Sequence, residues 1–264
     1  MHYRCVVTSG PPVGACQPGC DGARPAGVAI ALTRVQLWAR DCDTLPLTGI
    51  TLQVAPGQSV ALHSPADGTA ISLLDAIAGL ARPRSGQVAV GEVAVDRLTG
   101  SAMERYRGDR GLLSARFPLL SSLSVTDNVL AGLGSRRADA AARERAAELL
   151  VVSAIGHLAA RRVDTLSAEQ QWRILIARAL LSAPQLVLAE DPAPGLTAPS
   201  AARVLDLLMD AHDRFGFTLL LATSRIAAAV RCQRLVSLAD GVVQADELVG
   251  DDDPWTRGRV DRIG

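Results

Sequence analysis

The sequence predicts an α/β protein with a mostly parallel central sheet that helices cover on both faces. Short apolar runs alternate with amphipathic segments along the chain, which is the pattern of a doubly wound fold. One run, Gln185 to Ala189, is almost uniformly apolar, as strands buried inside a parallel sheet are. Apolar side chains make up 48% of the 264 residues, so the chain can bury a core of the size that such a fold needs.

The first half of the chain predicts mainly strands. Apolar stretches bounded by Gly and Pro favour strands at Val28 to Trp38, Leu47 to Val54 and Ser59 to His63. Apolar residues at helical spacing predict a helix over Ile71 to Leu80. A strand pair is expected over Gly86 to Val95.

The second half predicts mainly helices. Helical spacing of apolar residues occurs in four segments, Ser124 to Leu133, Ala138 to Ile155, Thr165 to Leu181 and Ser200 to Phe215. Phe217 to Thr223 is expected to be a strand. Leu235 to Val243 is expected to be a hairpin that turns at Asp240-Gly241.

The organisation predicted is one domain with two flanking segments. Residues 1–27 are rich in Gly, Pro and Cys without periodicity, which is typical of a disordered leader. Residues 28–247 carry the strand and helix patterns. Residues 248–264 are expected to form an acidic, flexible tail.

Composition excludes several classes of protein. A formal net charge of zero argues against a nucleic-acid partner, which needs a concentrated basic face. No apolar run approaches the roughly 20 residues of a membrane-spanning helix. Cys16 and Cys20 lack a second pair that would complete a metal site. His212 is expected at the surface. The chain contains no lysine, so all 27 basic side chains are arginine.

Five segments, in order, carry a resemblance to a known family. They are Leu47 to Gly57, Ala78 to Gly86, Leu166 to Leu180, Leu186 to Pro192 and Leu238 to Val242. Together they resemble the nucleotide-binding subunits of ABC transporters, most closely those of the lipoprotein-releasing and macrolide-export type.

The resemblance implies a P-loop NTPase fold of the ABC ATPase type. Such a fold has a mostly parallel core sheet, an antiparallel β subdomain and a helical subdomain, here at about residues 114–167. It implies ATP and Mg as cofactors, and pairing as a homodimer or as a heterodimer with an active paralogue. It also implies a membrane permease as partner, which would hold the subunit in the cytoplasm at the inner face of the cell membrane.

The resemblance also implies a phosphate-binding loop, and here the sequence departs from the family. The family's two glycines fall on Ser64 and Thr69, its lysine on Ala70 and its magnesium-binding hydroxyl on Ile71. Losing one cation within about 4 Å of a phosphate removes roughly 4 kcal/mol at an effective dielectric of 20. The nucleotide-binding residues that the resemblance implies are Ser64, Pro65, Asp67, Gly68, Thr69, Ala70, Ile71, Ser72, Trp38 and Ser167.

The acidic pair after the apolar run is inverted. The family has Asp and then Glu, the first for magnesium and the second for the attacking water, whereas this chain has Glu190 and then Asp191. If the protein is active, Asp191 and Glu190 are the catalytic residues and Glu190 is the metal ligand.

Further family positions are also replaced. The signature turn keeps Ser167, but Glu169 brings a carboxylate towards the phosphate held by a second subunit. The magnesium-sensing glutamine falls on Ala115 and the switch histidine on Ser224.

Three hypotheses therefore stay open. The segment Leu119 to Leu130 still matches the family segment that abuts the permease, which favours a docking subunit without ATPase activity. The second hypothesis is a divergent active ATPase in which an arginine replaces the lysine, with Arg82 and Arg84 as the nearest candidates downstream. The third is a soluble interaction module without a transporter.

Overall fold

A six-stranded sheet lies at the centre of the computed structural model, which describes residues 27–39, 42–64, 68–134, 136–191 and 195–250. The order of its strands is β10-β9-β3-β8-β7-β6. Every neighbouring pair is parallel except β9 with β10, which form a hairpin. The strands are β3 (Ser59–His63), β6 (Gly111–Leu113), β7 (Leu186–Glu190), β8 (Thr218–Thr223), β9 (Arg234–Ala239) and β10 (Val242–Leu248).

The central strands β3, β7 and β8 are buried on both faces. Their side chains alternate between two apolar clusters, so that Ala61 of β3 faces one cluster and Leu62 faces the other. Because successive strand residues point to opposite faces, a run that is apolar throughout supplies both cores at once. This confirms the α/β fold class expected from Gln185 to Ala189.

A second, antiparallel sheet packs over one face, with the order β2-β1-β4-β5. Its strands are β1 (Ile30–Ala39), β2 (Cys42–Val54), β4 (Ser85–Val90) and β5 (Val93–Ala94). Apolar residues from β1, from helix α1 and from β3 share one cluster, so α1 lies between the two sheets. Gly86 allows β4 to approach β1 closely, because a Cβ there would lie 2.3 Å from the carbonyl oxygen of Arg34.

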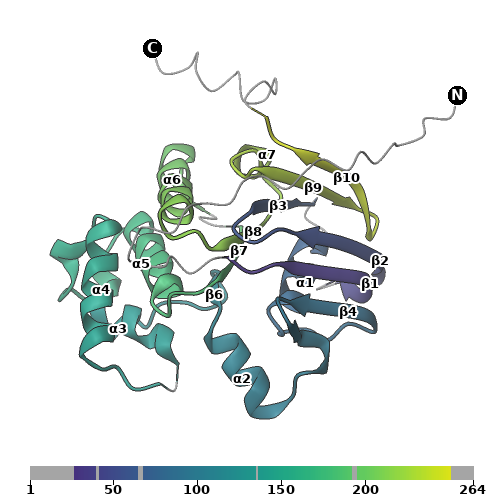
Figure 1. Cartoon of the computed structure of the whole chain (residues 1–264). Helices are drawn as coiled ribbons and strands as arrows, with labels where there is room; N and C mark the ends of the chain where they lie inside the picture. Colours follow the sequence, from purple (N-terminus) through teal and green to yellow (C-terminus); the bar gives the residue numbers. More distant parts are fainter. Residues whose placement is uncertain (1–26, 40–41, 65–67, 135, 192–194, 251–264) are drawn as a thin grey trace, which may run out of the picture.

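Helices cover the remaining surface of the central sheet. They are α1 (Thr69–Ile77), α2 (Gly100–Gly108), α3 (Val125–Leu130), α4 (Ala140–Val152), α5 (Ala168–Leu180), α6 (Ala198–Phe215) and α7 (Ile226–Ala229), with short 3-10 turns η1 (Val95–Arg97), η2 (Ala131–Leu133), η3 (Gly156–Leu158) and η4 (Val163–Thr165). Figure 1 shows α3, α4 and α5 gathered on the side of the molecule away from the antiparallel sheet. Among the described residues, no helix has both the length and the apolarity required to cross a membrane.

The predicted elements agree with the structure in kind and differ at their ends. Strand Ser59–His63 has the predicted bounds, and α1 begins at Thr69 and ends at Ile77. Helix α2 and strand β6 were not predicted, because α2 is mostly polar and β6 has three residues. The prediction that His212 lies at the surface is wrong, since it is buried under Phe217. Nearly all of the predicted leader and tail lies outside the described residues.

Candidate functional site

The carboxyl ends of four parallel strands meet at one edge of the central sheet. Residues at or just after these ends are Ser64, Ser114, Glu190 and Thr223, from β3, β6, β7 and β8. In open α/β sheets, ligands bind in the crevice outside this edge. The structure therefore brings together the phosphate-loop segment and the acidic pair that the sequence singled out.

The start of α1 uses its polar groups within the chain. Gly68 caps the helix with a left-handed conformation at φ 74°. The backbone N–H of Ala70 donates to the buried Ser64 Oγ at 3.3 Å, and the Ser72 hydroxyl donates to the Gly68 carbonyl at 2.8 Å. The Ala70 amide, which an ABC-type site would turn towards phosphate, is thus occupied, and the Ser72 hydroxyl is bonded within the first turn of α1. Pro65 and Asp67 lie outside the described residues.

Buried side chains also fill the position of the missing lysine. Ala70 and Thr69 are buried, and Ile71 is half-buried against the apolar cluster that α1 shares with the antiparallel sheet. These three residues serve the packing of the first helical turn.

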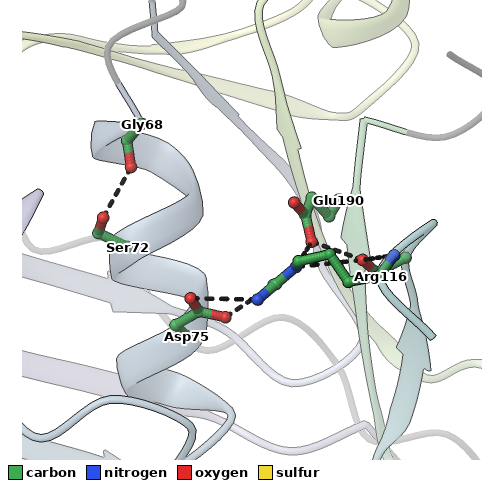
Figure 2. A network of polar contacts seen from close by, with 6 residues as sticks. Gly68, Ser72, Asp75, Arg116 and Glu190 are labelled. Atoms are coloured by element: carbon green, nitrogen blue, oxygen red, sulfur yellow. Dashed lines mark hydrogen bonds and ion pairs between the residues drawn. The ribbon is translucent and has the colours of Figure 1, made fainter. Parts of the chain in front are cut away.

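Glu190 at the end of β7 is held by an arginine. The Arg116 Nε donates to Glu190 Oε2, and the Ser114 hydroxyl donates to the same oxygen at 2.6 Å. The Arg116 guanidinium also reaches Asp75 on α1, with Nη2 to Oδ1 at 2.8 Å and Nη1 to Oδ2 at 3.4 Å. Figure 2 shows Arg116 between the two carboxylates. A cation therefore joins the end of β7 to the helix that follows the phosphate loop.

The charges of this network are largely removed from water. The side chains of Asp75, Glu190 and Arg116 are 2%, 14% and 26% exposed. Burial alone would lower the pKa of Arg116, but its hydrogen bonds with Asp75 and Glu190 raise it instead. Because both buried carboxylates share one guanidinium, removing Arg116 would take the same cation from two buried carboxylates at once.

Asp191 has a separate set of partners. Its Oδ1 accepts hydrogen bonds from Thr223 Oγ1 at 3.0 Å and from Arg225 Nε at 3.1 Å. Its backbone N–H donates to the Ala222 carbonyl at 2.7 Å, and its φ of 27° lies in the left-handed region that non-glycine residues rarely adopt. Arg225 follows Ser224, the position at which the family has its switch histidine. Each residue of the acidic pair is thus paired with an arginine.

Residues of the signature turn cap the start of α5. Ser167 accepts from the Gln170 N–H at 3.3 Å, and Gln170 Oε1 accepts from the Ser167 N–H at 2.9 Å, which is a capping box. Glu169 contacts Arg203 on α6 at 2.7 Å and Arg173 at 3.1 Å. Within the chain, both contacts of the Glu169 carboxylate are therefore with arginines.

The Glu169 contacts predict a measurable pH dependence. Hydrogen bonds from Arg203, against the opposing effect of burial and with help from Arg173, lower the pKa of Glu169 from 4.5 to about 2. A depressed carboxyl pKa adds stability that is complete above the unfolded pKa and is lost as the pH falls towards 2. Arg203 is half exposed, so solvent screening limits the contribution to about 1 kcal/mol. Urea unfolding of Glu169→Gln is expected to show this loss at pH 7 and no difference from wild type near pH 2, whereas a constant difference would contradict it.

Trp38 lies at the surface near the end of β1. It is 49% exposed, and the Arg84 guanidinium lies 5.9 Å from its ring centroid. Arg82 donates to the Leu98 carbonyl at 3.1 Å. Both arginines considered as substitutes for the lysine therefore have partners away from the start of α1.

The residues present do not fit Mg-ATP in the way of an ABC ATPase. The chain has no lysine, and Ile71 stands where the family has its magnesium-binding hydroxyl. The Ala70 N–H is bonded to Ser64, and Arg116 lies against the carboxylate expected to hold magnesium. The described residues also contain no group of three or more His, Cys, Asp or Glu that could hold a metal ion.

Sequence reasoning missed Arg116 and Asp75. A signal exists for Asp75, because it is a carboxylate among the apolar residues of α1 and is itself buried. Such a group needs a buried partner cation. No local pattern identifies that partner, since Arg116 lies 41 residues further along the chain.

A second feature is a basic groove of about 740 Å³ between α2, η2 and α5. Two acidic residues, Glu104 and Asp109, line it together with five arginines, Arg105, Arg107, Arg110, Arg136 and Arg178. The Nε atom of Arg110 is buried without a hydrogen-bond partner among the described residues. Burial lowers the pKa of Arg178, whose guanidinium donates to the carbonyls of Phe117 and Pro118. The groove therefore carries excess positive charge beside the segment predicted to face a permease.

Comparisons with known proteins give a consistent family. A family profile described as "ABC transporter" matches residues 47–194. An uncharacterized ABC transporter ATP-binding protein of Mycobacterium bovis is 33% identical over 201 residues. The match covers 75% of this chain, but this chain spans only 58% of that protein's length. The lipoprotein-releasing system ATP-binding protein of Anaeromyxobacter dehalogenans is 36% identical over 203 residues, which cover 76% of this chain and 85% of that one.

A solved structure supports the same relationship. It is a dimeric ATP-binding cassette in a post-hydrolysis state bound to ADP and phosphate, with a TM-score of 0.73 and 25% identity, and the match covers 84% of this chain and 99% of that one. This chain accordingly belongs to the nucleotide-binding subunits of ABC transporters and fits the lipoprotein-releasing and macrolide-export type.

Proposed function

We propose that this protein is a subunit that docks on a membrane permease and has the cassette fold without turning over ATP. One observation carries the proposal: Arg116 lies between Asp75 and Glu190, at the sheet edge where the family holds magnesium, in a chain with no lysine. The subunit would be held at the inner face of the cell membrane by its permease.

The binding energy lost with the lysine is large enough to make the affinity for Mg-ATP very weak. A lysine lost from a site about 4 Å from phosphate removes roughly 4 kcal/mol at an effective dielectric of 20. A further penalty arises if the Arg116 contacts must break before a metal reaches Glu190. Since each 1.4 kcal/mol is a factor of ten, about 4 kcal/mol lowers the affinity roughly a thousandfold.

The dimer of the solved cassette suggests how such a subunit contributes. We propose that this chain pairs with a second cassette, either a copy of itself or an active paralogue. Ser167 caps α5 and Glu169 is paired with Arg203, so the signature turn carries an anionic residue bonded within the chain. A paralogue's nucleotide would then face this altered turn.

Mg-ATP is expected to leave the thermal stability of the wild-type protein unchanged. A ligand present at about 100 times its dissociation constant adds about 2.7 kcal/mol, which shifts the melting temperature by several degrees. Differential scanning fluorimetry in millimolar Mg-ATP, with the dimeric cassette solved with ADP as positive control, measures this directly. A shift of several degrees, or steady phosphate release that Asp191→Asn abolishes, would instead support a divergent but active ATPase.

The basic groove supports docking on a permease. Phe117 is partly exposed at its edge, and Leu120 beyond it is 51% exposed, so apolar contact area lies beside the arginines. Complementary charge steers association and selects partners. The groove therefore favours an acidic, partly apolar cytoplasmic segment of the permease.

Charge reversal in the groove is expected to abolish docking. The variant Arg105→Glu with Arg136→Glu changes two exposed arginines, and like charges facing each other cost several kcal/mol, so recovery of the permease should fall at least about tenfold. The measurement is co-purification from solubilised native membranes, with the retained protein identified by mass spectrometry. Arg97→Glu is the control, because Arg97 is exposed and lies outside the groove.

Two outcomes would count against docking. Recovery of no membrane protein with the wild type would favour a soluble interaction module. Equal recovery with the double variant would show that the groove is not the docking surface.

A further inference from the structure

We infer that the Arg116 guanidinium is the resident cation of this site, in the place where a divalent metal would otherwise join β7 to α1. The inference deepens the proposed function and rests on it, because a site that holds Mg-ATP requires this space. It assigns Arg116 a role as a built-in counter-ion that ties the two elements together without a bound metal.

The first step of the argument is the burial of Asp75. Its side chain is 2% exposed on a helix whose neighbouring residues, Leu74 and Ala76, belong to the apolar cluster. An ionised carboxylate in such surroundings is stable only with a cation or with several donors. Arg116 supplies two contacts to it, at 2.8 Å and 3.4 Å.

The second step is the geometry of the guanidinium. Its planar fork matches a carboxylate through the two Nη atoms and leaves Nε for a second acceptor. Here the second acceptor is Glu190, on a different element, so one side chain bridges α1 and the end of β7 (Figure 2). A lysine ammonium is a point charge without this fork, so it cannot reproduce the bridge.

The third step is the support of Arg116 itself. Its backbone N–H donates to Ser114 Oγ at 3.0 Å, and that hydroxyl donates to Glu190 at 2.6 Å. The side chains of Ser114 and Arg116 thereby fix the segment after β6 to Glu190 of β7, and the Arg116 backbone N–H holds the Ser114 hydroxyl in place. This segment continues to Phe117 at the edge of the basic groove, so the bridge also anchors one wall of the docking surface.

The fourth step is what happens when the guanidinium is removed. Asp75 and Glu190 would lose the cation that both contact, and hard divalent cations bind pairs of carboxylate oxygens. The loss of Arg116 should therefore create a metal-responsive site that the wild type lacks.

The test compares Arg116→Met with the wild type in the presence of metal alone. Titration with Mn²⁺, followed by electron paramagnetic resonance of the free ion, is expected to show binding to Arg116→Met at least about tenfold tighter than to the wild type, or 1.4 kcal/mol. Melting temperature is the second readout: the variant should melt lower than wild type in EDTA and recover part of the difference in Mn²⁺.

Three variants serve as controls. Arg116→Lys keeps the charge and should not gain metal binding. Arg116→Met with Asp75→Asn removes one carboxylate and should lose the response. Arg225→Met removes the arginine beside Asp191, whose pair is one-third exposed and lies outside the bridge, and should not respond to metal.

Several outcomes would overturn the inference. One is equal Mn²⁺ binding by wild type and Arg116→Met, and another is an unchanged response in the double variant. If Arg116→Met is recovered unfolded, refolding should succeed in Mn²⁺ and fail in EDTA, and equal failure in both would also refute the role.

The nucleotide measurement separates this inference from the proposed function. Binding of Mg-ATP by the wild type would refute the proposed function even if the metal-alone results are as expected. If the wild type binds Mg-ATP and Arg116→Met binds it at least about tenfold more weakly, Arg116 contacts phosphate in place of the lysine. The resident-cation role is then refuted as well.

Discussion

Replacing Phe217 with alanine is expected to lower the free energy of unfolding by about 3–5 kcal/mol. Phe217 is 1% exposed, and its ring packs edge-on against His212 with centroids 5.5 Å apart and an interplanar angle of 83°. The Nε2 of His212 lies 3.0 Å from the Gly57 carbonyl. Truncation therefore leaves a cavity and also loosens the contact that joins the end of α6 to the turn before β3.

The measurement is chemical denaturation followed by circular dichroism, with Phe215→Ala as the matched control. Phe215 is the last residue of α6, two residues before Phe217, and is partly buried against the same cluster, so its truncation should cost clearly less. Equal losses for the two variants would contradict the assignment of Phe217 to the core. The thermal response to Mg-ATP should stay unchanged in both.

Replacing Gly132 with alanine is expected to lower the free energy of unfolding by about 1–3 kcal/mol and to distort the basic groove. A Cβ at Gly132 would lie 2.6 Å from the carbonyl oxygen of Arg178 and 3.0 Å from its Cγ. The carbonyl belongs to α5, so either η2 or α5 must shift. Both elements line the groove, and the shift should weaken recovery of the permease as well as stability.

Gly108→Ala is the control for Gly132→Ala. Gly108 also lines the groove, but a Cβ there would meet only the end of the Arg136 side chain, at 3.8 Å. It should leave the melting temperature within a degree or two and docking unchanged. A stable Gly132→Ala variant with normal docking would show that the close approach of η2 to α5 is unimportant.

The fold was largely predictable because its signals are local. The apolar run at Gln185 to Ala189 and the helical spacing of Ser200 to Phe215 are read within a single segment, and both elements are present. Helix α2 escaped prediction because its apolar residues are few, and its place depends on Met103 and Tyr106 reaching the cluster beside α1.

The sequence shows which family residues the candidate site lacks, but it does not show that Arg116 occupies the site. The missing lysine and the inverted Glu190-Asp191 pair are visible in the printed sequence. Arg116 is not, because its partners Asp75 and Glu190 lie 41 and 74 residues away. The helical context of His212 favours a surface position, whereas in the structure it packs against Phe217 and lies 3.0 Å from the Gly57 carbonyl.

The sequence by itself therefore determined the α/β class, the family and the absence of the phosphate-loop lysine, since these depend on composition, period and motif order. Only the tertiary structure decided that one guanidinium joins Asp75 to Glu190 and that five arginines line one groove. The physical reason is that pairing of buried charges depends on distances across the fold, which are set by how sheet and helices pack rather than by neighbours along the chain.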